Sequence, residues 1–344
     1  MSSETENKHQ FGNNSAQVPL KIILTGKFKK MEFTSPIKQI ISHLEKIQSF
    51  NAQDPLDDTR KYLDTMSLQL NGKKESVAMI EELNIPIENH QIPIRIYRPK
   101  GKTAQKSSAI VYIHGGWFIA GGFETHDAVV RKLANKTGSA VILVDYRLAP
   151  EHPFPAGLND SVDAVKWVVD HAESLGIDKN QIGIVGDSAG GALAASVSTQ
   201  IGELLKFQIL IYPAADNQLN TQSWGIYETG PVLNKEGGIQ AWNWYYPDGK
   251  NNPDPLAVPV LIKDFKNTPS TLVLIAEHDA LRDEGELLAQ HMKDAGISVR
   301  TSFYKDMVHG FMHMGEVLNE VEQAANEMAT FAHQHLEIVV EKEA

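Results

Sequence analysis

One serine stands in the sharpest local pattern of the chain. The segment GDSAGG, residues 186–191, has the form G-x-S-x-G and lies between an apolar run that ends at Val185 and the Ala/Ser-rich stretch Ala192–Gln200. A strand, a tight turn and a helix in this order leave the Ser188 hydroxyl exposed at the helix start, where the helix dipole favours a developing negative charge. The pattern predicts a nucleophilic serine, although an ordinary helix-start turn has the same form.

A serine hydroxyl is a weak nucleophile that needs a neighbouring base, and the base needs an orienting acid. His309 follows the last expected strand and Asp279 follows the strand before it. The chain order Ser, Asp, His is the one expected when all three lie at the carboxyl ends of strands in one sheet. We expect Ser188 to attack a carbonyl, His309 to accept and return its proton, and Asp279 to hold the imidazole in the required tautomer.

Other residues compete for these roles. His278 could replace His309 as the base, and Asp283 or Glu284 could serve as the acid, although both acids fit better as cap and surface charges at the start of a helix. His309 and His313 are four residues apart and could share a metal ion. No H-E-x-x-H pattern accompanies them, so we expect no metal site.

Donors for the oxyanion are the third requirement of acyl transfer. The segment His114–Trp117 reads HGGW and directly follows the apolar run Ala109–Ile113. Glycines in this position allow backbone N–H groups to approach a reacting carbonyl closely. We therefore expect an oxyanion hole made by the amides of Gly115, Gly116 and Ala189, although the segment taken alone also fits a simple glycine turn.

The elements that must position these residues alternate between strands and helices. Most of the strand candidates are nearly continuous apolar runs, as in strands buried on both faces. The expected strands are Ala109–Ile113, Ala140–Val144, Gln181–Val185, Phe207–Ile211, Thr271–Ala276 and Ser298–Tyr304, and the expected helices are 125–137, 157–175, 189–203 and 281–295. Gly138, Gly176 and Gly296 fall where helices should stop. This alternation predicts a mostly parallel sheet with helices on both faces.

The N-terminal part of the chain has a different character. Residues 1–17 are polar and indicate a disordered tail. Residues 35–50 have apolar side chains at helical spacing, and a second amphipathic helix is expected after Pro55. The alternation of apolar and polar residues over Gln91–Tyr97 predicts one strand of a half-exposed hairpin.

A long stretch, residues 213–268, separates two expected strands and holds three of the five tryptophans. We interpret it as an inserted cap that packs against the N-terminal helices, because long connections inside compact domains tend to be functional. An irregular crossover with an ordinary aromatic core is the alternative. The chain then divides into a tail (1–17), an N-terminal cap segment (18–75), a first part of the core (76–212), a cap insertion (213–255) and a second part of the core (256–344).

Composition restricts the function classes further. The chain has 344 residues, no cysteine and a formal net charge of −11. An acidic chain gains nothing from counterion release, so we expect no nucleic-acid partner, and an anionic membrane surface is not favoured either. The lack of cysteine excludes disulfides, zinc thiolate sites and cysteine nucleophiles. With no secretory signal and no apolar run long enough for a bilayer, we expect a cytoplasmic protein.

Several separated motifs resemble those of the hormone-sensitive-lipase-like (bacterial family IV) carboxylesterases of the α/β-hydrolase superfamily. In chain order they are IVYIHGGWFIAGG, VDYRLAPEHPFPAGLND, GDSAGG, YYPDGKNNPDP, HDALRDEG and MVHGF, within about residues 77–335. The resemblance implies an α/β-hydrolase fold with an eight-stranded sheet under a helical cap. It also implies hydrolysis of short- to medium-chain acyl esters without a cofactor.

The resemblance also assigns site residues by position. The family's triad matches Ser188, Asp279 and His309. Its oxyanion hole matches Gly115, Gly116 and Ala189. Two departures stand out: Trp117 occupies the place of the usual third glycine, and Ala280 that of the usual proline after the acid. We expect the side chains that contact the substrate to include Trp117, Asp187, Trp224 and Tyr227.

Three other functions use the same features. An amidase or deacetylase would have the same triad, and nothing in the sequence separates it from an esterase. A ligand receptor on a hydrolase fold is expected to lack a triad member, and an interfacial lipase is expected to have an exposed amphipathic lid. We therefore expect a carboxylesterase whose partner is a small-molecule acyl ester. A homodimer through the edge strand near Ser298–Tyr304 is compatible with the family likeness alone.

Overall fold

The computed structural model describes residues 33–46, 55–101 and 106–336. Within these residues one eight-stranded sheet has the order β1-β2-β4-β3-β5-β6-β7-β8. The strands are β1 Met79–Ile87, β2 His90–Arg98, β3 Ser107–Ile113, β4 Ala140–Val144, β5 Ile177–Asp187, β6 Phe207–Ile211, β7 Ser270–His278 and β8 Val299–Val308. β2 is antiparallel to both β1 and β4, and every other pair is parallel. The expectation of a mostly parallel sheet is confirmed.

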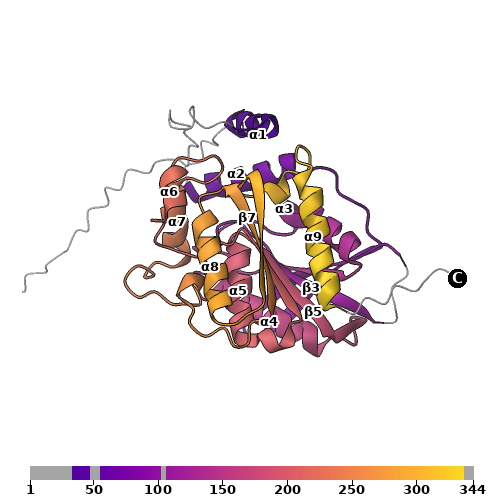
Figure 1. Ribbon diagram of the computed structural model, residues 1–344. Coiled ribbons are helices and arrows are strands. Elements are labelled where there is room, and N and C mark those ends of the chain that lie inside the picture. The colour runs from indigo at the N-terminus through magenta and orange to yellow at the C-terminus, as the bar shows by residue number, and fades with distance from the viewer. Residues whose placement is uncertain (1–32, 47–54, 102–105, 337–344) are drawn as a thin grey trace, which may run out of the picture.

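Helices cover both faces of this sheet (Figure 1). One face carries α3 Phe123–Thr137 and α9 Glu320–His335, and the other carries α4 Ala156–Asp170, α5 Ala189–Ile201 and α8 Arg282–Asp294. Above one end lie α1 Ser35–Lys46, α2 Pro55–Leu70, α6 Gln222–Ile226 and α7 Lys235–Tyr245. The part of the chain that the structure describes also holds three short 3-10 helices, η2 Gly202–Leu204, η3 Pro259–Leu261 and η4 Phe311–His313.

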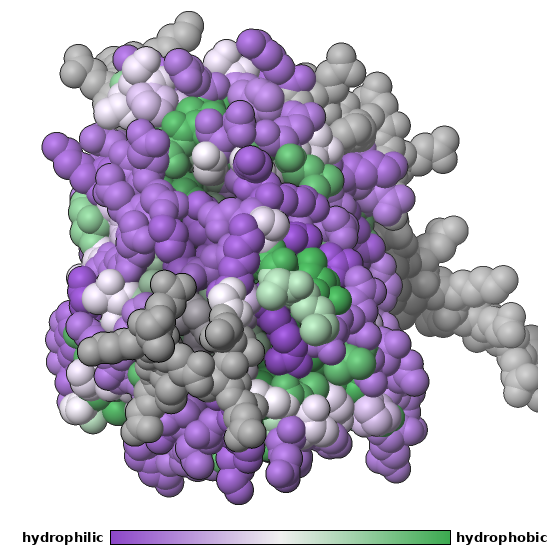
Figure 2. Space-filling model, turned by 90° about the vertical axis from the view of Figure 1, so that its right-hand side faces the viewer, coloured by the Kyte–Doolittle hydropathy of each residue, from purple (hydrophilic) through white to green (hydrophobic). Residues whose placement is uncertain are grey.

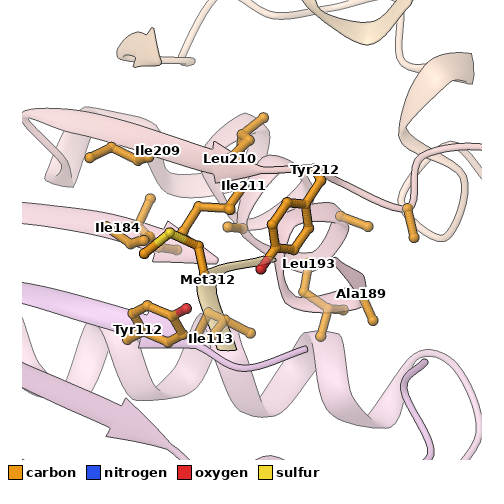
Figure 3. Packing of buried hydrophobic residues seen from close by; sticks show 14 of the residues in the cluster. Tyr112, Ile113, Ile184, Ala189, Leu193, Ile209, Leu210, Ile211, Tyr212 and Met312 are labelled. Atoms are coloured by element: carbon orange, nitrogen blue, oxygen red, sulfur yellow. The ribbon is translucent and has the colours of Figure 1, made fainter. Parts of the chain in front are cut away.

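The central strands form where the sequence is apolar on both faces. Every residue of β4 and β6 is buried, and both strands have the bounds expected from the sequence. The α5 helix, rich in Ala and Ser, packs closely on the sheet. Glycine at position 190 permits this approach, because a Cβ atom there would lie 2.0 Å from the carbonyl oxygen of Ile113. Figure 3 shows the side chains of β3, β5, β6 and α5 packed together beside Tyr212 and Met312.

Some elements differ from their expected bounds. The helix α4 ends at Asp170 rather than near 175, since residues 171–176 form turns and Gly176 adopts a positive φ of 64°. Gly138 ends α3 in the left-handed conformation, as expected. The helix α9 was not anticipated, although its buried residues Val321, Ala324 and Met328 follow helical spacing.

The two N-terminal helices form as amphipathic elements. In α1 the buried side chains are Ile37, Ile40 and Leu44, as the spacing predicted. The helix α2 is attached to the body of the protein by Arg60, whose guanidinium donates to the carbonyl oxygen of Ile119 at 2.7 Å and pairs with the carboxylate of Glu151. The expected tail 1–17 lies outside the described residues, and the division into core and cap stays a prediction.

The molecular surface fits the acidic composition. Hydrophilic residues predominate on the face in Figure 2, and hydrophobic surface occurs there in small patches. Among the helices that the structure describes, none combines the length and the apolar character needed to cross a bilayer. The strand β8 lies at the sheet edge with Phe303 about half exposed, and the homodimer contact expected there stays a prediction.

Candidate active site

Ser188 sits on a strained turn between β5 and α5. Its backbone has φ 53° and ψ −119°, a region that side-chain-bearing residues rarely adopt. Small neighbours make the turn possible, because a Cβ atom at Gly186 would lie 2.2 Å from the carbonyl oxygen of Gly190. The Ser188 amide donates to the carbonyl oxygen of Ile211 at 2.8 Å, which fixes the turn to the end of β6.

The structure brings Ser188, Asp279 and His309 together. The Nε2 atom of His309 lies 2.9 Å from the Ser188 Oγ, and its Nδ1 lies 2.7 Å from the Asp279 Oδ2. The other carboxylate oxygen of Asp279 accepts the Leu281 amide at 2.8 Å, so the carboxylate is held from both sides. Because Nδ1–H donates to the carboxylate, Nε2 is left to accept the serine proton.

The competing candidates are engaged elsewhere. The Nδ1 atom of His278 lies 3.0 Å from the Tyr227 hydroxyl, and its ring meets Phe33 edge to face. The Oδ2 atom of Asp283 accepts the Ser223 amide at 2.7 Å at the start of α6. Neither His278 nor Asp283 hydrogen-bonds to the triad residues.

Glu284 is not the surface charge that its place in the first turn of α8 suggested. It is fully buried, and its carboxylate accepts the Ala215 amide at 2.8 Å and the indole N–H of Trp224 at 2.9 Å. Trp224 is therefore a buried partner of Glu284, while Tyr227 is buried against His278. Neither aromatic residue lines the cavity at Ser188, where the sequence analysis expected both to contact substrate.

The cavity at Ser188 is small and largely apolar. It has a volume of about 50 Å³, and its apolar lining comes from α2, from Trp117 and from Val232 and Leu233 in the 213–255 stretch. A neighbouring cavity of about 20 Å³ shares Leu63, Trp117, Val232 and Leu233 with it. Trp117 thus lines both cavities, and its expected contact with substrate stays a prediction.

The expected oxyanion donors are not equivalent. The amide of Gly115 donates to Asp187 Oδ1 at 3.0 Å, so this N–H is already engaged. The amides of Gly116 and Ala189 have no acceptor among the described residues, and neither does that of Trp117, which the sequence analysis did not include. The geometry therefore leaves Gly116 and Ala189 available and adds Trp117 in place of Gly115.

His114 supports this loop from beneath. Its ring stacks on Tyr146 with centroids 4.3 Å apart, and its Nδ1 donates to the carbonyl oxygen of Gly115 at 2.8 Å. Burial lowers the pKa of His114 to about 3, so the ring is neutral at physiological pH. A neutral, buried ring in this position braces the loop and takes no part in proton transfer.

A second carboxylate–imidazole group adjoins Ser188. This group, the Asp187 cluster, comprises His126, Asp187 and His313, all three buried and all three in the cavity lining. Asp187 Oδ1 lies 3.1 Å from His126 Nε2 and Oδ2 lies 3.2 Å from His313 Nε2, while the Tyr112 hydroxyl donates to Oδ1 at 3.0 Å. Burial opposes ionisation, but the two imidazoles outweigh it and hold the pKa of Asp187 well below its usual value.

From the sequence, Asp187 is expected only as a substrate contact, with no connection to His126 or His313. The three residues come from β5, α3 and η4, and no local pattern links them. The spacing of His309 and His313 was noted, but the structure directs their rings to different carboxylates.

Known proteins share both this fold and these segments. A family model described as alpha/beta hydrolase fold matches residues 110–313. An ethyl acetate hydrolase of Pseudomonas putida is 34% identical over 291 residues, which cover 81% of this chain and 90% of that protein. The carboxylesterase NlhH of Mycobacterium tuberculosis is 37% identical over 242 residues, covering 68% of this chain and 75% of that one.

Solved structures agree with these relatives. A hyperthermophilic esterase of the archaeon Pyrobaculum calidifontis superposes with a TM-score of 0.82 at 35% identity and covers 88% of this chain and 99% of its own. A thermostable carboxylesterase from a metagenomic library superposes with a TM-score of 0.77 at 35% identity, covering 82% and 98%. The chain belongs to the hormone-sensitive-lipase-like carboxylesterases of the α/β-hydrolase superfamily.

Proposed function

We propose that this esterase cleaves short- to medium-chain acyl esters through an acyl-enzyme intermediate on Ser188. The observation that carries the proposal is the continuous hydrogen-bonded series from Asp279 through His309 to Ser188, with separations of 2.7 and 2.9 Å. The series ends in an apolar cavity, where an ester carbonyl can meet the hydroxyl.

In the first step the Ser188 oxygen attacks the ester carbonyl carbon while His309 Nε2 takes the hydroxyl proton. The oxyanion that forms is stabilised by free amides at Gly116, Trp117 and Ala189. The carbon–oxygen bond to the alcohol then breaks, and His309 returns the proton to the departing alcohol. A water molecule repeats the sequence on the acyl-enzyme and releases the carboxylic acid.

The size of the cavity supports a short acyl group. An apolar lining favours hydrocarbon over polar groups, and a volume of about 50 Å³ leaves little room for a long chain without movement of Trp117 or Leu233. The name of one relative, ethyl acetate hydrolase, refers to an acetyl ester and supports a short acyl group.

A panel of p-nitrophenyl esters from acetate to dodecanoate tests the proposal, with the matched p-nitroacetanilide as the amide arm and Ser188→Ala as the control. We expect kcat/KM to be highest between acetate and hexanoate and to fall for longer chains. The amide should be cleaved far more slowly than acetate ester, and the variant should cleave neither. An optimum at dodecanoate, or an anilide rate equal to the ester rate, would contradict the proposal.

A further inference from the structure

The Asp187 cluster holds chemistry that the proposed ester cleavage does not use. Its potential ligand atoms, two imidazole nitrogens and a carboxylate oxygen, lie within 4.8 Å of one another. Each of the three side chains is at least nine-tenths buried, yet each also lines the cavity at Ser188. The cluster is therefore a preformed set of N and O donors with access to the substrate space.

Both imidazole rings are oriented by neighbours on their far side. Asn71 Nδ2 donates to the Thr125 carbonyl oxygen at 2.7 Å, which turns the Asn71 Oδ1 atom toward His313 Nδ1 at 3.1 Å. His126 Nδ1 lies 2.8 Å from the Thr125 hydroxyl. Histidines that bind metal ions usually have their second nitrogen hydrogen-bonded in this way, which fixes the ring and directs the other nitrogen at the ion.

This orientation has a consequence for the nitrogen of His313 that faces Asp187. Because Asn71 Oδ1 can only accept, the His313 Nδ1 atom carries a proton and cannot bind a metal ion. The Nε2 atom is the remaining metal-ligating atom of the ring, and it lies 3.2 Å from Asp187 Oδ2. A cation bound between these two atoms makes an attractive contact with each of them.

The spacing of the donors is close to that around a transition-metal ion. Bonds of about 2.0–2.2 Å at tetrahedral angles put neighbouring ligand atoms about 3.3–3.6 Å apart. The separations here are slightly shorter, at 3.1 Å from His126 Nε2 to Asp187 Oδ1 and 3.2 Å from His313 Nε2 to Asp187 Oδ2. Two histidines and one carboxylate leave a fourth position open, as in zinc sites with an exchangeable ligand. We propose that the Asp187 cluster binds Zn²⁺ and that the bound ion inhibits ester cleavage.

Inhibition follows from where the cluster lies, and this half of the proposal rests on the proposed function. Asp187 directly precedes Ser188, and its Oδ1 atom accepts the Gly115 amide. A metal that draws the carboxylate toward itself pulls on the Ser188 turn and on the glycine loop together. All three residues of the cluster also line the cavity that the substrate must enter, so a bound ion would adjoin the substrate.

Binding is tested first in the full-length Ser188→Ala variant, so that the result does not depend on catalysis. Co²⁺ is titrated and its visible d–d absorption recorded, followed by displacement with Zn²⁺. Since the chain has no cysteine, thiolate bands cannot confuse the spectrum. We expect intense tetrahedral bands that disappear on addition of Zn²⁺.

Variants in the Ser188→Ala background locate the ion. His313→Asn removes a ligand and should weaken Co²⁺ binding by about 100-fold or more, and Asn71→Ala removes only the outer partner and should weaken it by about 10- to 100-fold. His278→Asn is the matched control, because Glu277, His278 and Asp306 form another His–carboxylate group among the described residues. It should leave the titration unchanged. Circular dichroism checks that each variant is folded, and Asn71→Ala still decides if His313→Asn is not.

The inhibitory half is tested with Zn²⁺ and EDTA on the enzyme with Ser188 intact. Ester cleavage should fall with the midpoint measured for binding, recover with EDTA, and shift to higher Zn²⁺ in His313→Asn when each rate is divided by its own metal-free value. Absent Co²⁺ bands, or bands lost in His278→Asn and kept in His313→Asn, overturn the site. Bands without inhibition overturn the regulatory role alone, and an inactive parent enzyme overturns the proposed function and leaves the spectra decisive for the site.

Discussion

The two carboxylate–imidazole groups beside Ser188 are built from the same residue types and differ in what the outer ring nitrogens contact. Asp279 orients one ring, that of His309, whose second nitrogen reaches the Ser188 hydroxyl. Asp187 meets two rings, and their second nitrogens end on Asn71 and Thr125. Proton transfer needs a ring with a free path to the substrate. The comparison therefore shows that the contact made by the ring nitrogen that points away from the carboxylate decides whether the histidine can transfer protons.

We expect the largest loss of activity on removal of the Ser188 hydroxyl, which contacts the ring held by Asp279 and neither ring beside Asp187. Ser188→Ala removes the nucleophile and should lower kcat by about 10⁴-fold or more. The thermal midpoint should change little, since alanine keeps the Cβ atom and the backbone conformation. Steady-state ester kinetics measure the loss, and a variant within tenfold of the parent rate would show that the nucleophile lies elsewhere.

The next largest effect on activity distinguishes Asp279 from Asp187. Asp279→Asn leaves the shape of the site but favours the wrong His309 tautomer, so kcat should fall by about 10³- to 10⁴-fold. Single-turnover measurement of acylation reports this step directly. Asp187→Asn should affect acylation much less, because no ring attached to Asp187 contacts Ser188. Equal losses in the two variants would erase the distinction between the groups.

For stability we expect the opposite order, with Asp187→Asn less stable than Asp279→Asn. Asp187→Asn leaves two buried imidazoles, the Tyr112 hydroxyl and the Gly115 amide around a neutral group. Removing one partner from a buried charged network costs about 3 kcal/mol or more in the free energy of unfolding. Urea unfolding at neutral pH measures it. A cost below 1 kcal/mol would mean that the cluster contributes little to the fold.

The smallest effect is in the acid limb of the stability curve. The pKa of Asp187 is lower in the folded protein than its ordinary value of 3.8, so the ionised form stabilises the fold above that pH. This contribution is lost as pH falls through the folded value. The stability difference between the parent and Asp187→Asn should therefore be constant from pH 7 to about 5 and shrink at lower pH, by at most about 1.4 kcal/mol per pH unit. A difference that grows on acidification would contradict the assignment.

The features of the molecule that depend on local pattern can be predicted from the sequence. The turn at Ser188 needs small residues at fixed positions, and β4 and β6 are apolar throughout, so each is visible within a few residues. The amphipathic helices before the sheet were equally readable, and the helix α9 had a comparable signal that was not used.

The remaining features depend on pairings distant in sequence. The position of Trp224 in an inserted aromatic stretch predicts a substrate contact, but its buried indole N–H donates to Glu284, sixty residues away. Among 13 histidines nothing local marks His126 and His313 as neighbours of Asp187. Only the packing of α3 and η4 against the end of β5 brings them together.

The positive φ of Ser188 lowers thermal stability at a residue that activity requires. A backbone at φ 53° and ψ −119° suits glycine better than any residue with a side chain, and such strain costs about 1–3 kcal/mol. Ser188→Gly should therefore melt at a higher temperature than the parent while losing the hydroxyl. A laboratory evolution that rewards heat resistance alone will drift toward glycine at this position, so any such selection must also demand turnover.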